Sequence, residues 1–331
     1  MEADGGGGAG RNGRALMRAA RLHAWGAAPV LDEVPPPTRA DGEVLVTVEA
    51  AAVAHLDLTI AGGDFGMKPQ LPYIGGVEGA GVVAESGGGL EPGTQVILRG
   101  GGLGMLRDGT WTEQVSVPAK AVTPLAEPLP PAVAATFFVP ATTAYVALHD
   151  VARLQPGEEV VVVGAAGAVG AMVAQQAVAA GATVIGVVGR SDQLDLVPDG
   201  IEAVDGSSDE SVARLAESRT ATLLVDTLGG EGLVGRSRWV RRGGRAVVIG
   251  YVTGTSVTID LPSWLLDDVA LLPVNMIRQE RRAREVSDEL VRRLAAGELG
   301  VAVQPYDLAD AAAAVEDLRA GRVAGRAVVL P

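Results

Sequence analysis

The sequence predicts an α/β fold in two parts, a mostly antiparallel β unit and a doubly wound parallel sheet. Three observations support this prediction. The first part of the chain carries short β-rich runs, the second part alternates strand-like and helical segments, and 48% of the 331 residues are hydrophobic. A chain of this length fits two domains of roughly 100 to 200 residues each, and its apolar content can fill two cores.

Antiparallel strands are predicted between residue 17 and about residue 130. The runs are EVLVTVEA, YIGGVEGAGVVAE, GTQVILRG and TWTEQVSV, and Gly, Pro and Asp separate them. Short strands with turn residues between them are typical of a compact, mostly antiparallel unit.

A parallel sheet is predicted from about residue 132 onward. EEVVVVG is a continuous apolar strand, AVGAMVAQQAVAAG is a helix that ends at Gly181, and ATVIGVVG is the next strand. The alternation continues through SVARLAES, ATLLVDTLGG, LVGRSRWVRRGG and RAVVIGYV. Strands that are apolar on both faces and joined by helices indicate a doubly wound sheet. After Leu272 we expect a helix in RQERRAREVSDELVRRLAAGEL, a strand near VAVQPYDL, a helix in ADAAAAVEDLRAG and a last strand in RAVVLP.

The composition argues against several classes of site. The 40 acidic and 27 basic residues give a net charge of -13, so no basic stripe favours nucleic acid as a partner. The absence of cysteine excludes disulfides, thiolate zinc sites and a cysteine nucleophile. Because His23, His55 and His149 are the only histidines, we expect no metal site built from histidines.

Two segments bear on where the protein works. Residues 1–16, MEADGGGGAGRNGRAL, indicate a disordered leader, and they lack the apolar core of a signal peptide. Residues 160–189 carry no charge and are long enough to span a membrane, which takes about 20 apolar residues. Glycines interrupt this run where strands and helices are predicted to begin or end, so we expect no membrane span and a cytoplasmic protein.

Residues 164–170, GAAGAVG, lie between a predicted strand and a predicted helix. The fingerprint G-x-G-x-x-G is present at residues 165–170, with Ala165 in place of its first glycine. Glycines let the backbone approach a pyrophosphate, whose charge is met by free N–H groups at the helix N-terminus. The placement predicts a dinucleotide site, the alternative being a glycine-rich turn kept for tight helix–sheet packing. The predicted binding residues are Gly164, Ala166, Gly167, Ala168, Val169 and Gly170.

The end of the next strand bears on which dinucleotide binds. An NAD site places a carboxylate there for the ribose hydroxyls, whereas a 2'-phosphate requires a cation and hydrogen-bond donors. Gly189 leaves room, and Arg190 and Ser191 supply a guanidinium and a hydroxyl. This pattern predicts NADP(H), the alternative being that Arg190 is an ordinary exposed arginine and Asp192 takes the acidic role.

Several segments together resemble a zinc-independent medium-chain dehydrogenase/reductase of the quinone oxidoreductase and enoyl reductase branch. In chain order they are EVLVTVEAAAVAHLDLTIAGG, LPYIGGVEGAGVVAESG, EPGTQVI, GTWTEQVSVPA, PATTAYVALHDVARLQPGEEVVVVGAAGAVG, VDTLGG, RRGGRAVVIG and AGRVAGRAVVL. The resemblance implies a GroES-like catalytic domain at residues 17–138, a Rossmann NADP(H)-binding domain at 139–272, and a C-terminal part at 273–331 that completes the catalytic domain. It also implies a homodimer, with the nicotinamide in the cleft between the domains.

The resemblance assigns further residues to the cofactor. Thr143 matches a segment that lines the cofactor cleft, and Gly250 and Tyr251 match the edge that contacts the nicotinamide ribose. Asn275 falls in the strand that usually runs beside the nicotinamide. Arg326 takes the place of a basic residue that many relatives have near the cofactor.

The sequence also departs from the family pattern. Zinc-dependent relatives have cysteine at the position of Ala54 and histidine at that of Val77, and neither residue present here binds zinc. Quinone reductases usually have asparagine at the position of Ala54, and many enoyl reductases place a tyrosine donor in the loop that here is GGDFGMKPQLPY. In this loop, Lys68 and Tyr73 are the candidate proton donors.

His55, next to Ala54, is the third catalytic candidate. In relatives with this segment, the residue beside the cysteine leans toward the cofactor pyrophosphate, so His55 is expected to contact the phosphates or relay a proton to the ribose. The alternative is a partly exposed histidine that touches only solvent. Asp57 resembles a recurrent family aspartate and is expected to support the cleft. Loop positions further suggest an apolar pocket formed by Phe65, Tyr73, Trp111 and Trp264.

The expected activity is metal-free hydride transfer from NADPH to an activated C=C bond or a quinone, with a small molecule as substrate. Conjugated carbonyl compounds suit this chemistry because the carbonyl group delocalises the charge that arrives with the hydride. Two alternatives stay open: a trans-acting enoyl-thioester reductase of a biosynthetic pathway, and a protein that binds NADPH without turnover as a sensor or structural component.

Overall fold

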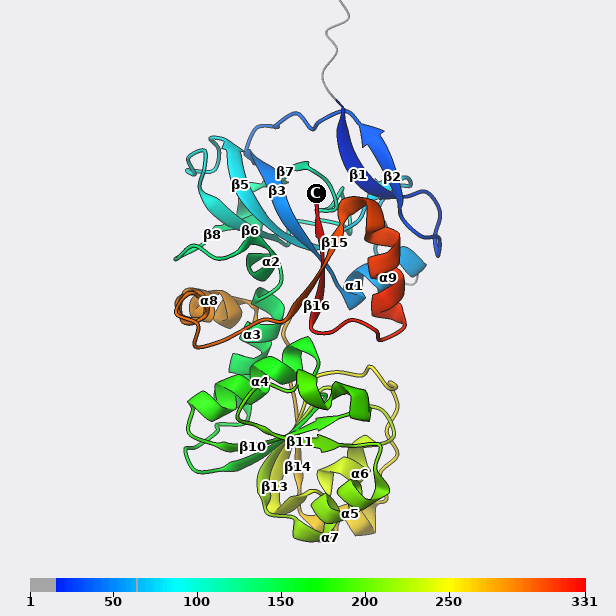
Figure 1. Cartoon of the computed structure of the whole chain (residues 1–331), viewed down its shortest axis with the longest axis vertical. Helices are drawn as coiled ribbons and strands as arrows, with labels where there is room; N and C mark the ends of the chain where they lie inside the picture. The colour runs from blue at the N-terminus through cyan, green and yellow to red at the C-terminus, as the bar shows by residue number, and fades with distance from the viewer. Residues whose placement is uncertain (1–15, 64) are drawn as a thin grey trace, which may run out of the picture.

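A computed structural model describes residues 16–63 and 65–331. The predicted leader lies outside these residues except for Leu16, so that prediction is not tested. The chain forms two halves stacked along its long axis (Figure 1). Both the beginning and the end of the described chain lie in the upper half, and the middle of the chain builds the lower half. Within the described residues, no helix combines the length and apolar character that crossing a membrane requires.

The upper half contains a seven-stranded sheet and a small three-stranded sheet. The larger sheet has the order β15-β16-β3-β5-β6-β8, with β7 also pairing with β3, and the smaller has the order β2-β1-β4. Their pairs are antiparallel except β15 with β16. The bounds are β1 (Met17–Leu22), β2 (Val30–Val34), β3 (Glu43–Val53), β4 (Tyr73–Ile74), β5 (Glu78–Glu85), β6 (Gln95–Arg99), β7 (Gln114–Pro118), β8 (Val122–Pro124), β15 (Val303–Asp307) and β16 (Arg326–Leu330).

The lower half is a six-stranded parallel sheet with the order β11-β10-β9-β12-β13-β14. Its strands are β9 (Glu159–Val163), β10 (Thr183–Val188), β11 (Glu202–Asp205), β12 (Ala221–Asp226), β13 (Val240–Val248) and β14 (Ala270–Pro273). The apolar runs that predicted this sheet are buried, since residues 160–163 and 223–225 have almost no exposed surface. The predicted combination of a mostly antiparallel unit and a doubly wound parallel sheet is confirmed.

The helices cover the sheets and connect the two halves (Figure 1). Among them, α8 packs against α3 near the level at which the halves meet. The helices are α1 (His55–Gly62), α2 (Pro131–Ala134), α3 (Phe138–Tyr145), α4 (Ala168–Ala179), α5 (Asp209–Ser218), α6 (Leu233–Ser237), α7 (Leu261–Asp267), α8 (Glu280–Ala295) and α9 (Ala311–Arg319). A π-helical segment, η2 (Val146–Val151), continues α3, and η1 (Ala119–Ala121), η3 (Ser191–Leu196) and η4 (Leu308–Asp310) are short 3-10 turns.

The C-terminal strands β15 and β16 join the large sheet of the upper half. β16 pairs with β3, so that Ala327 lies opposite Val53. This pairing brings Arg326 next to the chain segment that carries Ala54 and His55, more than 270 residues earlier in the sequence. An isolated bridge between Gly167 and Gly325 also joins the C-terminal segment to the loop between β9 and α4.

The segment LVGRSRWVRRGG contains less helix than the strand–helix alternation predicted. Its helix, α6, ends at Ser237, and β13 already begins at Val240. Trp239 and Val240 are both buried in the core of the lower half. Burial of these two side chains draws the chain into the sheet early, because an apolar pair gains more in the core than on an exposed helix end.

Candidate functional site

The loop between β9 and α4 is a tight, glycine-dependent turn that leads into the N-terminus of α4. Gly164 has a φ of 78°, and a Cβ on Gly170 would lie 2.1 Å from the carbonyl oxygen of Gly164, so both positions require glycine. No side chain caps α4, and the N–H groups of residues 168–170 have no partner within the described residues. These N–H groups are therefore free to bind an anion at the helix N-terminus.

The surroundings of Ala165 explain how alanine can replace the first glycine of the fingerprint. Its side chain is fully buried and faces Gly186 of β10, where an added Cβ would come within 2.9 Å of the Ala165 Cβ. The alanine methyl thus fills space that the neighbouring strand leaves empty. This side chain points into the core and does not obstruct the free N–H groups.

The residues at the end of β10 keep both cofactor alternatives open. A Cβ added at Gly189 would be in ordinary contact with the Gln193 side-chain oxygen, at 3.8 Å. Arg190 pairs with Asp192, with its Nε 3.0 Å from Oδ1, and both side chains are exposed. A 2'-phosphate would have to compete with Asp192 for this guanidinium.

The other predicted cofactor residues lie on separate elements. Thr143 is buried in α3, whereas Tyr251, on the loop after β13, is 74% exposed. Gly250 is pressed against the loop after β12, because an added Cβ would meet the carbonyl oxygen of Thr227 at 2.3 Å. Asn275 is exposed and accepts a hydrogen bond from the backbone of Arg278 through its side-chain oxygen.

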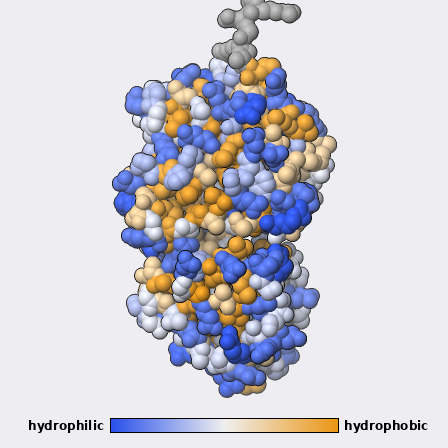
Figure 2. All heavy atoms as spheres, viewed as in Figure 1, coloured by the Kyte–Doolittle hydropathy of each residue, from blue (hydrophilic) through white to orange (hydrophobic). Residues whose placement is uncertain are grey.

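A cavity of about 560 Å³ reaches from the upper half to the N-terminus of α4. We call it the central cavity. Figure 2 shows that the molecular surface narrows between the two halves, with apolar side chains on both sides of the narrowing. The lining is mainly apolar with a few charged groups, and consists of Ala54, His55, Leu56, Val77, Glu78, Arg99, Gly100, Leu103, Met105, Val139, Val169, Glu280 and Arg326.

An ion-pair network forms the charged part of the central cavity. Glu78 is 9% exposed and lies between two guanidinium groups, 2.8 Å from Arg326 and 3.3 Å from Arg99. Arg99 also pairs with Glu280 at 2.9 Å. The Arg326 Nε is buried without a partner among the described residues. The structure thus places Arg326 in the same cavity as His55 and Val169. The sequence analysis missed the other members of the network, Arg99, Glu78 and Glu280.

The missed residues gave only a weak signal in the sequence. Arg99 directly follows the apolar strand residues VIL, so its position at a strand end was visible. Glu280, however, is 181 residues away from it in the chain. Only the packing of α8 against the upper half brings the two side chains together.

Asp57 supports the floor of the central cavity. Its carboxylate accepts hydrogen bonds from the backbone N–H groups of Ala54 at 2.8 Å and Val77 at 3.0 Å. Complete burial raises the pKa of Asp57 to about 7, and the nearby Glu78 adds to this effect. The carboxylate therefore ties together the two segments where zinc-dependent relatives carry metal ligands.

His55 begins α1 at the rim of the central cavity. Burial and the neighbouring Arg326 lower its pKa, so its imidazole is neutral at neutral pH. Its side chain makes no hydrogen bond within the described residues, and it is open to the cavity. Among the same residues, no group of three or more His, Cys, Asp or Glu side chains is arranged to hold a metal ion.

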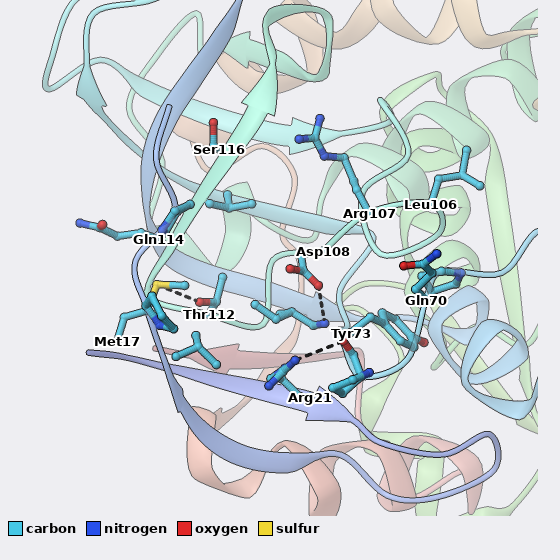
Figure 3. A pocket seen from close by; sticks show the side chains of 18 of the residues that line it. Met17, Arg21, Gln70, Tyr73, Leu106, Arg107, Asp108, Thr112, Gln114 and Ser116 are labelled. Carbon is cyan, nitrogen blue, oxygen red and sulfur yellow. Dashed lines mark hydrogen bonds between the residues drawn. The ribbon is translucent and has the colours of Figure 1, made fainter. Parts of the chain in front are cut away.

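Lys68 and Tyr73 line a different cavity, which is shown in Figure 3. This cavity has a volume of about 880 Å³ and lies between β1, β7 and the loops that carry Pro72 and Asp108. Tyr73 is buried against Trp25, and burial raises its pKa further above the ordinary value. Lys68 lies 5.6 Å above the Trp25 ring. The structure therefore does not bring Lys68 and Tyr73 together with His55 in one cavity.

The apolar pocket expected from Phe65, Tyr73, Trp111 and Trp264 does not form, so this prediction was wrong. Trp111 is a core residue that donates a hydrogen bond to the carbonyl oxygen of Ala52. Trp264 lies on α7 in the lower half and donates to the carbonyl oxygen of Val269. The positions of these residues in the sequence gave no information on where their side chains point.

Comparisons with known proteins agree with this architecture. Residues 40–127 match the family described as alcohol dehydrogenase GroES-like domain, and residues 200–329 match the family described as zinc-binding dehydrogenase. The chain is 30% identical to the acrylyl-CoA reductase AcuI of Ruegeria pomeroyi over 298 residues, which cover 87% of this chain and 90% of that protein. It is 28% identical to the mitochondrial enoyl-[acyl-carrier-protein] reductase of Xenopus tropicalis, covering 77% of this chain and 75% of that protein.

A solved structure shares the fold of this chain. The quinone oxidoreductase of Pseudomonas syringae pv. tomato DC3000 superimposes with a TM-score of 0.80 at 25% identity, covering 95% of this chain and 100% of that one. The fold, the order of the matched segments and these relatives agree with one another. The chain therefore belongs to the medium-chain dehydrogenase/reductase family, in the branch of the quinone oxidoreductases and enoyl reductases.

Proposed function

We propose that this chain is an NADPH-dependent reductase that transfers hydride to an activated C=C bond or a quinone. One observation carries the proposal: a mainly apolar cavity opens directly at the N-terminus of α4, where backbone N–H groups are free for a phosphate. Val169 belongs both to this helix end and to the cavity wall. A dinucleotide bound at the loop would therefore have an apolar chamber for its reactive end.

The residues present fit a nicotinamide dinucleotide. The free N–H groups of residues 168–170 would hold its pyrophosphate. Arg326, whose Nη1 has no hydrogen-bond partner within the described residues, offers a further donor in the cavity wall. Gly189 leaves space for the adenosine ribose, and Arg190 would bind a 2'-phosphate after leaving Asp192. When bound, the reduced nicotinamide supplies a hydride.

The chain's own part in the reaction is to position the substrate and exclude water. The side chains of Leu103, Met105 and Val139 form an apolar wall that suits a hydrocarbon chain or ring. At the floor, Asp57 fixes the backbone of Ala54 and Val77. His55, neutral at the rim, can contact the cofactor phosphates or pass a proton to the ribose.

Enoyl thioesters are the second candidate substrate class. The relatives named acrylyl-CoA reductase and enoyl-[acyl-carrier-protein] reductase support this alternative, because both names specify an enoyl group. A quinone oxidoreductase with the same fold supports the first candidate. A conjugated carbonyl group is common to both substrate classes.

The test is a turnover assay with purified protein. NADPH or NADH is mixed with a quinone, a simple enone or an enoyl thioester, and loss of the reduced-nicotinamide absorbance is followed. We expect oxidation of NADPH with at least one acceptor and slower oxidation of NADH. Tight NADPH binding without oxidation by any acceptor would instead support a sensor or structural protein.

We further propose that the protein works as a cytoplasmic homodimer. Its parallel sheet ends in the edge strand β14, and the neighbouring α7 exposes several large apolar side chains, namely Leu261, Leu265 and Leu266. An unpaired strand edge beside an apolar helix face favours association with a second copy.

A further inference from the structure

Arg99 lines the central cavity and keeps a donor atom that its ion pairs do not use. Its Nη1 donates to both carboxylate oxygens of Glu280 at 2.9 Å, and its Nε lies 3.3 Å from Glu78. Within the described residues its Nη2 has no hydrogen-bond partner, and this atom is not buried. Because a guanidinium has five N–H donors, Arg99 can keep its ion pairs and still bind a ligand.

The protein holds the Arg99 guanidinium in a defined orientation. Its central carbon lies 4.8 Å from the centroid of the Phe138 ring, at the start of α3. The two carboxylates hold it from other sides, and its side chain is only 30% exposed. A donor held in position beforehand needs little reorganisation when negative charge develops nearby.

Building on the proposed function, we propose that Arg99 binds the carbonyl oxygen of the substrate and stabilises the charge that this oxygen gains during reduction. The substrate class is a conjugated carbonyl compound whose carbonyl oxygen points toward β6. This role fits a chain that lacks asparagine at the Ala54 position and has Tyr73 in another cavity. The two candidate donors named from the sequence, Lys68 and Tyr73, both line the other cavity.

The reaction balances with Arg99 as an electrostatic group. With a reduced nicotinamide bound, the β-carbon of the substrate would accept a hydride and form a C–H bond, and loss of the hydride would leave the nicotinamide oxidised. The electron pair of the C=C bond then moves to form a double bond between the α-carbon and the carbonyl carbon, and the oxygen becomes an enolate. Arg99 keeps its protons because an arginine side chain stays protonated at neutral pH. Water then protonates the α-carbon and is left as hydroxide, and the carbonyl group re-forms.

Glu280 is the competing anion in this arrangement. Its carboxylate binds Arg99 and also lies 3.0 Å from Arg284, so it has a second cation when Arg99 turns to a ligand. Loss of its charge should leave Arg99 more available to an oxyanion. Arg99 and Glu280 variants should therefore shift ligand binding in opposite directions, although both break the same ion pair.

The first experiment measures turnover with NADPH and an enone in the intact protein. We expect Arg99→Gln to lower kcat about 100-fold, the usual cost of losing one oxyanion donor, while the Kd for NADPH stays within about twofold. Arg107→Gln is the matched control, because the Arg107 side chain is 33% exposed, against 30% for Arg99, and pairs with Glu43 outside the central cavity. It should retain the wild-type rate. Arg99→Lys keeps the charge without the planar fork and should be intermediate.

The second experiment needs no turnover. 4-Nitrophenolate carries an oxyanion on an apolar ring and mimics the enolate, and its binding in the presence of NADP+ is followed by its absorbance. We expect Arg99→Gln to weaken binding at least tenfold and Glu280→Gln to strengthen it severalfold. Equal binding to the wild type and Arg99→Gln would overturn the role of Arg99, whatever the turnover. Arg99-dependent phenolate binding without reduction of any acceptor would support the oxyanion site and overturn the reductase function.

Discussion

Arg190 and Asp192 form an exposed ion pair at the point where the cofactor ribose would lie. The sequence offered two interpretations of this pair, an arginine that binds a 2'-phosphate or an aspartate that binds ribose hydroxyls. The structure shows both side chains together, so their relative contributions can be separated only by changing one at a time.

We expect Arg190→Ala to weaken NADPH binding about tenfold and to leave NADH binding almost unchanged, because a charge-assisted hydrogen bond contributes on the order of 1.5 to 3 kcal/mol. Asp192→Asn should strengthen NADPH binding by removing a competing and repelling carboxylate. Dissociation constants for both cofactors, measured with each variant, provide the test. A loss of NADH affinity in Asp192→Asn would instead show that Asp192 takes the acidic role.

Asp57 gives a pH dependence whose sign follows from its raised pKa. Its pKa rises from 3.8 in the unfolded chain to about 7 in the fold, so the folded protein holds this proton more tightly. The resulting stabilisation is complete below pH 3.8 and is lost as the pH rises through about 7.

We expect the wild type to lose more unfolding free energy than Asp57→Asn between pH 5 and pH 8, by on the order of a few kcal/mol. Urea unfolding at the two pH values measures this difference. Glu158, whose pKa Arg245 holds at about 2, acts in the opposite direction, but only below about pH 4.5. Equal losses in both proteins would show that Asp57 stays ionised in the fold.

At the scale of elements, the loop between β9 and α4 shows how far local sequence determines local structure. A run of valines predicted β9, the glycine pattern predicted the turn, and the alanine-rich run up to Gly181 predicted α4. The short α6 was not predicted, because burial of Trp239 and Val240 in the core overrides local helix preference. Local signals suffice where they agree with packing and fail where packing opposes them.

Gly170 is the position where a single methyl group should disrupt the loop. A Cβ there would lie 2.1 Å from the Gly164 carbonyl oxygen, so Gly170→Ala must displace the backbone. We expect at least tenfold weaker NADPH binding and a loss of stability of about 1 to 3 kcal/mol. Gly235→Ala is the control, because nothing lies within 4 Å of its added Cβ, and it should leave NADPH binding unchanged. Unaltered binding in Gly170→Ala would contradict the role of this loop.

At the scale of the whole molecule, the central cavity depends on the return of the chain to the upper half. β16 carries Arg326 back to β3, and α8 places Glu280 against Arg99. The four charged residues of the network come from distant parts of the sequence. Glu78, Arg99 and Arg326 meet through the pairing of strands in the upper sheet, and Glu280 joins them through the packing of α8. The edge strand β14 of the lower half pairs only with β13 within the described residues, and its outer edge is left without a neighbouring strand.

We expect the protein to elute as a dimer, and the double substitution Leu265→Glu with Leu266→Glu to produce monomers. These two side chains are 70% and 72% exposed beside β14, so charges there should oppose association without disturbing the core. Light scattering after size-exclusion chromatography measures the mass. Leu106→Glu, an exposed leucine of the upper half, should remain dimeric. A monomeric wild-type protein would contradict the proposed homodimer.

The sequence by itself determined the two-part architecture, the glycine-rich turn between β9 and α4, the family and the absence of the usual cysteine and histidine at residues 54 and 77. These features depend on periodicity and on residues close together in the chain, which is where sequence patterns carry information. Only the tertiary structure decided which side chains share the central cavity. It separated Lys68 and Tyr73 from His55, buried Trp111, and joined Arg99 to Glu280, because contacts between distant segments depend on how the elements pack.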